Sequence, residues 1–515
     1  MTSVAPSHIE RRPKPAFLII PLIALLTLFS WSFASPVGST PDEAFHLQSI
    51  WCAGGTPTPS CGDGPTPDTR SVADDLVDGS VCYANEPTRT PACQGEDFGD
   101  DLTQELETSS VGNFTGLYPP VFYFTMNLFT SDNLQLSVLA MRAFNSALFI
   151  GMVTLLFFLL PVQRRPTLLI SFAATLVPLG IFLIASVNPS GWAIMSAGML
   201  WIALLGFFET TGRRRVALGV FATVATVMGA GARADGAVYS VLAVAAVLVL
   251  QAERSRRFLL LAIVPVALSI VAALFFLSAG QSNAASTGLS LIRGGYSKYV
   301  LIVENFLNLP SLFVGVFGSW PLGWFDTPLP AIVPFAGTMT LGGLVLLGVG
   351  TSYARKTVAV LGGVVVLFLF PLVLLYQSDS RVGDQVQPRY ILPILVILLG
   401  VILLQRNGGA LRVNWVQALL FASALSISNA AALHANIRRY VRGVGIGGGN
   451  LDVGVEWWWD AGPSPMTVWV VGSLSFALVL LWLGFLWVRY SQANASNDLV
   501  TKSTIPVGHG RTRTS

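Results

Sequence analysis

The chain has 515 residues, of which 53% are hydrophobic and only 11% are charged, and its formal net charge is +3. Soluble domains carry about 25% charged residues, so this composition excludes an ordinary soluble domain. The hydrophobic residues form long blocks near the roughly 20 residues that a helix needs to cross a bilayer, without the alternation typical of barrel strands. The sequence therefore predicts an all-α integral membrane protein.

About twelve transmembrane helices are expected from these blocks. In chain order they are Ala16–Ser35, Leu134–Leu160, Leu168–Val187, Gly191–Phe208, Val216–Gly231, Ala237–Leu250, Phe258–Leu277, Ala331–Thr351, Thr357–Tyr376, Tyr390–Leu404, Trp415–Leu433 and Val468–Val488. The fifth and sixth are short, and they could instead form a broken or re-entrant pair around Arg233 and Asp235.

The domain boundaries follow from these spans. Residues 1–15 form a cytoplasmic N-terminus, residues 16–488 form the transmembrane domain, and residues 489–515 are polar and predicted to be a disordered cytoplasmic tail. Residues 36–131 form a large external loop after the first helix, rich in Pro, Gly, Asp and Thr, so we expect an irregular cap rather than a domain with a large core.

The distribution of charge tests this topology. The pieces expected in the cytoplasm hold 19 of the 30 Lys and Arg residues but only four of the 27 acids. Their net charge is +15 and that of the remainder is −12, which together give the +3 of the whole chain. Basic residues gather on the cytoplasmic side of membrane proteins. We therefore predict a multi-pass protein of a bacterial inner (plasma) membrane with both termini in the cytoplasm, whose basic clusters need no nucleic-acid partner.

All the cysteines fall in the first external loop. An even number of cysteines in one external loop indicates disulfides formed in an oxidising compartment. Three pairings are possible, and we favour the pairing of neighbours, Cys52–Cys61 and Cys82–Cys93. A zinc site is the alternative, but no Cys-x-x-Cys spacing supports it.

The acidic segment just after the first helix is the most informative one for chemistry. If Asp42, Glu43 and His46 lie on one helical turn, His46 shares a face with one or both acids. Such a group could act as a general base, or could bind a divalent cation such as Mg²⁺ or Mn²⁺. The alternative is a capped interfacial helix in which Asp42 favours the helix start and the other side chains are solvated.

Other candidate site residues lie at the ends of the expected spans. Arg233 and Asp235 lie between two short apolar segments, where they could serve function or form an ion pair that holds a turn. Arg389 could clamp a phosphate with two hydrogen bonds, or could extend towards lipid headgroups. Asn188 begins a turn between two spans, and Tyr118 leads into an apolar segment on the external side.

Several classes of enzyme are excluded by missing motifs. The sequence has no Walker loop, no dinucleotide-binding fingerprint after a strand and no Gly-x-Ser-x-Gly elbow. We therefore expect no direct use of ATP or nicotinamide.

Four motifs in this order resemble a bacterial family, domain of unknown function 2142, over roughly Pro15 to Val488. They are Pro41-Asp42-Glu43-x-x-His46, Tyr118-Pro119-Pro120-x-x-Tyr123, Asn188-Pro189-Ser190-Gly191 and Pro388-Arg389-Tyr390-x-Leu392-Pro393. The family more often has Gly before the Arg-Tyr pair, and the four cysteines are not one of its hallmarks. That family is similar to the GT-C superfamily of polyprenyl-phosphate-dependent glycosyltransferases.

The resemblance implies a GT-C-like membrane enzyme with its acid in the first external loop. Asp42 or Glu43 would be the base, and Arg389 would bind the lipid phosphate. Beyond the resemblance, we expect His46 to orient the acid or complete a metal site, and Arg233 to assist Arg389. We favour Asp42 as the base because its short side chain is the more rigidly placed. The reaction would transfer a hexose or pentose from a polyprenyl-phosphate donor to a cell-envelope glycan or lipid.

Two other functions remain open at this point. A transporter or flippase of lipid-linked glycans would also suit a dozen spans, but its ionisable groups should lie near the bilayer midplane. A non-catalytic membrane scaffold whose external loop binds a partner is the third possibility. The fold class and motifs do not by themselves decide between these functions.

Overall fold

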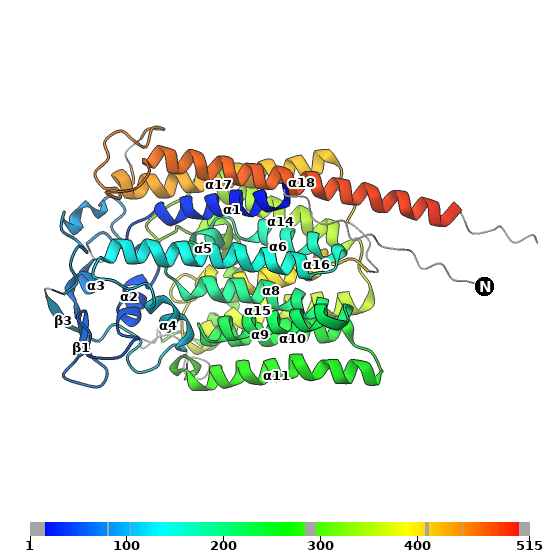
Figure 1. Ribbon diagram of the computed structural model, residues 1–515, viewed down its shortest axis with the longest axis horizontal. Coiled ribbons are helices and arrows are strands. Elements are labelled where there is room, and N and C mark those ends of the chain that lie inside the picture. Colours follow the sequence, from blue (N-terminus) through cyan, green and yellow to red (C-terminus); the bar gives the residue numbers. More distant parts are fainter. Residues whose placement is uncertain are drawn as a thin grey trace, which may run out of the picture.

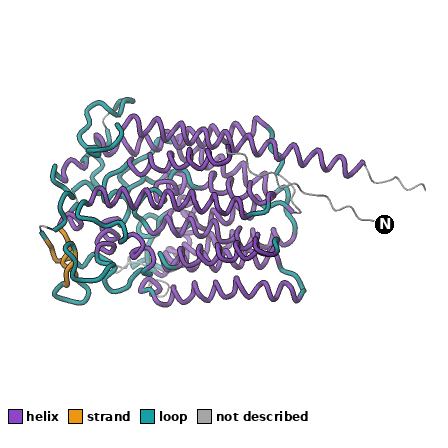
Figure 2. The backbone as a smooth tube through the Cα atoms, in the orientation of Figure 1, coloured by secondary structure: helices purple, strands orange, loops and turns teal. Residues whose placement is uncertain are grey.

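The computed structural model describes residues 16–79, 82–103, 105–283, 295–406, 411–445 and 447–503. These residues form a bundle of long helices with a cap of shorter elements and loops at one end (Figures 1 and 2). Nine of the described helices are long and apolar enough to cross a membrane. They are α5 (Leu134–Leu159), α8 (Pro189–Glu209), α10 (Ala234–Gln251), α11 (Arg256–Ser278), α13 (Lys298–Val314) with its continuation η4 (Gly315–Ser319), α14 (Ile332–Val349), α15 (Ala354–Gln377), α17 (Trp415–Arg442) and α18 (Pro465–Ser503).

Other helices run beside these nine. They are α1 (Ala16–Phe33), α6 (Arg165–Thr175), α7 (Leu179–Ile184), α9 (Gly212–Ala230) and α16 (Leu392–Leu403), with short helical turns at η2 (Val162–Arg164), η3 (Gly280–Asn283) and η5 (Pro388–Tyr390). The apolar part of α8 is completely buried, whereas that of α11 is 17% buried. The core of the bundle therefore lies around α8, and α11 presents most of its apolar surface outwards, as a helix in contact with lipid does.

Three of the expected spans differ from the observed helices. The predicted span Leu168–Val187 is two helices, α6 and α7, because Pro178 lacks a backbone N–H and restricts the residue before it. The predicted short pair is two helices of 19 and 18 residues, α9 and α10, of which α10 is among the nine candidate spans. Helix α18 extends beyond residue 488, where the predicted transmembrane domain ends, and continues to Ser503.

The cap contains more regular structure than the composition indicated. It begins with α2 (Glu43–Trp51) and includes a three-stranded antiparallel sheet of β1 (Cys61–Asp63), β2 (Arg70–Ala73) and β3 (Leu106–Ser109). The helices α3 (Asp74–Asp78), η1 (Pro91–Gln94) and α4 (Val121–Asn127) complete it. Both predicted disulfides are confirmed, Cys52–Cys61 and Cys82–Cys93.

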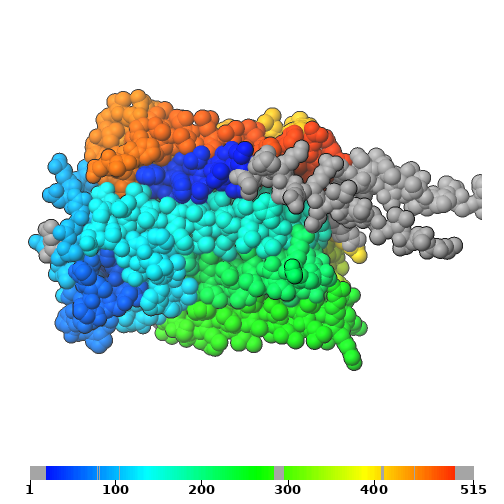
Figure 3. All heavy atoms as spheres, in the orientation of Figure 1, coloured from blue at the N-terminus to red at the C-terminus, as the bar shows by residue number. Residues whose placement is uncertain are grey.

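The two ends of the bundle differ. Figure 3 shows the atoms of the cap covering the left end, together with the segment that joins α17 to α18, whereas α1 begins and α18 ends on the right. At the end opposite the cap, Arg164 donates hydrogen bonds to Glu209 and to the carbonyl of Gln405, and so joins three connecting segments. The predicted cytoplasmic arginines of these segments therefore lie together at one end.

Helix α13 is an exception among the nine. Its first residue, Lys298, pairs with Asp379 just after α15 at 3.2 Å, and Gly315, just past its end, packs against Pro388. Both contacts are at the cap end of the bundle. Helix α13 therefore begins and ends at the same side, with apolar residues such as Tyr299 and Leu307 exposed. This is how an amphipathic helix lies along a membrane interface.

Candidate functional site

The loop that joins α1 to α2 is held by side chains from distant parts of the chain. Each backbone carbonyl from Phe33 to Gly38 accepts a hydrogen bond from a side chain. The donors, in order along the loop, are Trp459, Asn436, Arg142 (for two carbonyls), Tyr83 and Trp324. The last carbonyls of a helix lack partners within the helix, and here distant side chains supply them. The loop therefore fixes the positions of Asp42 and Glu43.

Glu43 is completely buried, and its carboxylate is already occupied. One oxygen accepts hydrogen bonds from the backbone N–H of Thr40 at 2.9 Å and from its hydroxyl at 3.1 Å. The other accepts from Arg142 of α5 at 3.2 Å, and both side chains of this ion pair are at most 1% exposed. Glu43 thus binds the loop to α5 and leaves no oxygen open to a substrate.

Asp42 has the opposite surroundings. Its side chain is 43% exposed, and one carboxylate oxygen lies 2.5 Å from Nη2 of Arg389, which is 4% exposed. Burial raises the pKa of Asp42, but the charge of Arg389 and its hydrogen bond, together with His46 and Arg233, outweigh burial, and the net shift is downwards. Asp42 begins α2 with a φ of 64°, and its side chain does not cap the helix. Asp42 therefore stands at the start of α2, as the capped-helix alternative expected, but it makes no capping hydrogen bond, and its carboxylate is ionised and accessible.

The carbonyl of Pro41 contacts two more of the predicted site residues. It accepts a hydrogen bond from Asn188 at 2.8 Å and a longer one from Arg389 at 3.3 Å. Asn188 also caps α8, since its side-chain oxygen accepts from the N–H of Ser190 at 2.9 Å. The start of α8 and the start of α16 are therefore both fixed to the loop that carries Asp42.

Arg233 and Asp235 form a second ion pair beside the first. Two nitrogens of Arg233 contact the two oxygens of Asp235 at 2.8 and 3.0 Å, and Arg233 also donates to the hydroxyl of Ser190 at 3.2 Å. The guanidinium groups of Arg233 and Arg389 both lie 5.4 Å from the ring centre of Tyr390. Tyr239 joins this group by donating to the carbonyl of Tyr390 at 2.6 Å. Two arginines therefore flank one aromatic ring.

Tyr118 and His46 form the aromatic side of the site. The guanidinium of Arg233 lies 5.7 Å from the ring of Tyr118, whose ring centre is 5.5 Å from that of His46. His46 bonds the hydroxyl of Tyr123 through Nδ1 at 3.0 Å, and its buried Nε2 has no partner among the described residues. Burial lowers the pKa of His46 to about 3, so the imidazole is neutral at physiological pH.

The expected metal site does not fit these contacts. No group of three or more His, Cys, Asp or Glu side chains is arranged to hold a metal ion anywhere in the described ranges. The oxygens of Glu43 are occupied, and Asp42 faces an arginine rather than His46. The predicted set of Asp42, Glu43 and His46 therefore does not match a site for Mg²⁺ or Mn²⁺, and His46 is not hydrogen-bonded to orient either acid.

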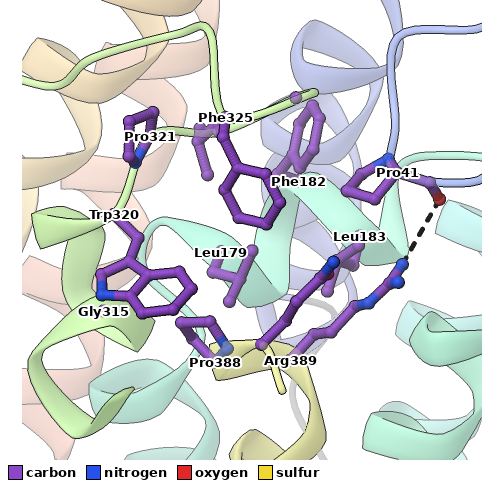
Figure 4. Close-up of a pocket in the computed structure, with 13 residues that line it drawn as sticks. Pro41, Leu179, Phe182, Leu183, Gly315, Trp320, Pro321, Phe325, Pro388 and Arg389 are labelled. Atoms are coloured by element: carbon purple, nitrogen blue, oxygen red, sulfur yellow. Dashed lines mark hydrogen bonds between the residues drawn. The ribbon is translucent and has the colours of Figure 1, made fainter. Parts of the chain in front are cut away.

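A mostly apolar pocket opens beside Arg389 (Figure 4). Its empty space is about 350 Å³ when the part open to solvent is counted, but the cavity itself is a shallow one of about 20 Å³. Its walls come from α7, from the segment after η4 and from the segment before α16, and they include Leu179, Phe182, Leu183, Trp320, Phe325 and Pro388. The guanidinium of Arg389 lies at one edge, bonded to Pro41. A positive charge beside an apolar hollow suits an amphiphile with an anionic head.

The structure brings together most of the predicted site residues, from five separate segments. Asp42, His46, Tyr118, Asn188, Arg233, Asp235 and Arg389 all lie at the cap end. Sequence reasoning missed Ser190, Tyr239 and Arg142, and it did not give Tyr390 a role. A single arginine inside an apolar span is costly unless it is paired, and that rule would have drawn attention to Arg142.

Comparison with protein families identifies the family of the chain. Residues 25–398 match the family described as "Predicted membrane protein (DUF2142)". This range includes every candidate site residue described above. No match to a curated protein was found.

Proposed function

The chain belongs to the DUF2142 family of predicted membrane proteins, and we propose that it is an integral membrane glycosyltransferase of the inverting type. Its donor would be a polyprenyl-phosphate hexose or pentose, and its acceptor a cell-envelope glycan or lipid on the outer face of the membrane. The observation that carries the proposal is the meeting of one accessible carboxylate, Asp42, with two buried arginines at one end of a helical bundle.

Asp42 has the properties of a general base. It is ionised, because Arg389 lowers its pKa, and it is partly open to solvent, so that an acceptor hydroxyl could approach it. The hydroxyl oxygen would attack the anomeric carbon while its proton passes to Asp42. The bond between the anomeric carbon and the phosphate oxygen would break, and its electron pair would remain on the lipid phosphate.

The arginines suit the leaving group. A guanidinium presents parallel N–H donors that match two phosphate oxygens, and a buried guanidinium stabilises developing negative charge more strongly than one in water. Arg389 lies at the edge of the apolar pocket, where the first part of a prenyl chain could lie. Arg233 is already paired with Asp235. Its role would therefore be to keep a positive charge near the lipid phosphate.

The position of the charges favours an enzyme over a transporter. A transporter is expected to bind its substrate near the bilayer midplane at interrupted helices. The two ion pairs of the site lie instead where helices begin at the cap end, before α2, α10 and α16. A scaffold function would not require an accessible carboxylate between two arginines.

Sugar transfer in reconstituted membranes tests the proposal. Donors would be polyprenyl-phosphate hexoses and pentoses labelled in the sugar, with envelope lipids and glycans as acceptors. Asp42→Asn should lower the rate by about 10²–10⁴-fold, the usual effect of losing a general base. Glu107→Gln, on the exposed β3 strand of the cap, is the matched control and should retain the full rate. Equal rates for both variants would contradict the proposal.

A further inference from the structure

Arg389 has a partner that a substrate phosphate would have to replace. Its Nη2 is bound to Asp42, its bond to the Pro41 carbonyl is long at 3.3 Å, and its Nε has no hydrogen-bond partner among the described residues. The guanidinium is otherwise buried, so a phosphate would approach from the side where the exposed part of Asp42 lies. The carboxylate and the phosphate therefore compete for the same donors.

We propose that Arg389 changes partner in each reaction cycle. In the ligand-free protein it holds Asp42, it shares its donors with the lipid phosphate once the donor binds, and it turns fully to the phosphate when Asp42 accepts the proton of the acceptor. This inference rests on the proposed function and adds to it a link between the base and the leaving group.

The balance of charge supports the exchange. A polyprenyl-phosphate sugar is a phosphodiester with one negative charge, and its phosphate gains a second charge when the sugar leaves. In the same step the proton from the acceptor neutralises Asp42, so Arg389 loses an anionic partner as a stronger one forms beside it. No oxidant, reductant or further reactant is needed.

Arg233 does not have the same freedom. Both oxygens of Asp235 are bound to it, and Ser190 accepts a further hydrogen bond. By contrast, one nitrogen–oxygen contact joins Arg389 to Asp42. The exchange is therefore assigned to Arg389, and Arg233 keeps its partner throughout.

The pKa of Asp42 would change in the direction that catalysis requires. Burial raises this pKa, and Arg389 is the largest of the groups that lower it. Once Arg389 contacts a phosphate, much of that lowering is lost and the carboxylate becomes a stronger base. Binding of the donor would thus prepare Asp42 to take a proton, and before binding Asp42 would remain a weak base.

Binding of a short amphiphile tests the competition directly. The probe is farnesyl monophosphate in detergent micelles, compared with the uncharged alcohol farnesol at the same salt concentration. Asp42→Asn is the variant of choice because Asn also adopts a positive φ readily, so the loop keeps its conformation. The variant should bind the phosphate about five- to tenfold more tightly than the unmodified protein. Its affinity for farnesol should be unchanged, as should both affinities of Glu107→Gln.

The outcomes separate this inference from the proposed function. If Asp42→Asn binds the phosphate no more tightly than the unmodified protein, or if neither binds it, the partner exchange is wrong. Transfer activity without tighter binding would leave the glycosyltransferase proposal standing and remove only the exchange. Tighter binding without transfer of any sugar would leave the competition for Arg389 intact and remove the glycosyltransferase.

Discussion

The two ion pairs at the start of α2 involve adjacent acids in contrasting surroundings. Glu43 and Arg142 are both at most 1% exposed, and three hydrogen bonds from the loop and from α5 occupy the carboxylate. Asp42 is 43% exposed and has one contact with Arg389. The buried pair fixes the position of the loop, whereas the open pair can exchange its partner. A buried charge in a membrane protein can therefore be structural even when its neighbour has the features of a reactive group.

The largest expected effect on stability comes from breaking the buried pair. Glu43→Gln leaves the charge of Arg142 buried without a counter-charge, which costs roughly 3–5 kcal/mol of unfolding free energy. Asp42→Asn should cost less, about 1–2 kcal/mol, because the carboxylate that it removes is 43% exposed and the amide oxygen that replaces it can still accept a hydrogen bond from the buried Arg389. Thermal unfolding of both variants in the same detergent would measure the difference. Equal losses of stability would show that the two pairs do not differ in this way.

A smaller effect is expected from a conservative change in the open pair. Arg389→Lys keeps the positive charge but cannot present two parallel donors to a phosphate. The rate of sugar transfer should fall about tenfold, with the unfolding temperature nearly unchanged. A normal rate would indicate that Arg389 only contacts lipid headgroups. Arg381→Lys, at an exposed arginine paired with Glu304, provides the matched control.

Much of the helical pattern and most of the site could be predicted from the sequence, for identifiable physical reasons. Long apolar runs predict helices in lipid, and the distribution of basic residues predicts which end of the bundle faces the cytoplasm. Motifs at helix ends contain Asp42, Arg233 and Arg389 because ionisable groups are tolerated there. Local spacing could not decide between Asp42 and Glu43, because their surroundings depend on Arg142 and Arg389, which lie 99 and 347 residues away.

The smallest predicted effect tests how the cap supports the loop. Tyr83, next to the Cys82–Cys93 disulfide, donates a hydrogen bond of 2.5 Å to the carbonyl of Val37 and is completely buried. Tyr83→Phe removes the donor and leaves the carbonyl unpaired, which should cost about 1–2 kcal/mol. The unfolding temperature should fall slightly, and sugar transfer should fall less than in Arg389→Lys. A larger loss of activity than in Arg389→Lys would mean that the support of the loop matters more for transfer than the phosphate contact does.

The supports of the loop after α1 also constrain how the protein assembles. That loop enters the membrane with the first helix, but the side chains that bond its carbonyls come from positions 83, 142, 324, 436 and 459. Contacts between residues far apart in sequence form late, and chains that require them fold slowly. The last hydrogen bonds to the loop can therefore form only after most of the chain has been synthesised and inserted. A chain interrupted before α17 would contain both acids and Arg389, yet would lack Asn436 and Trp459, which bond the first two carbonyls of the loop.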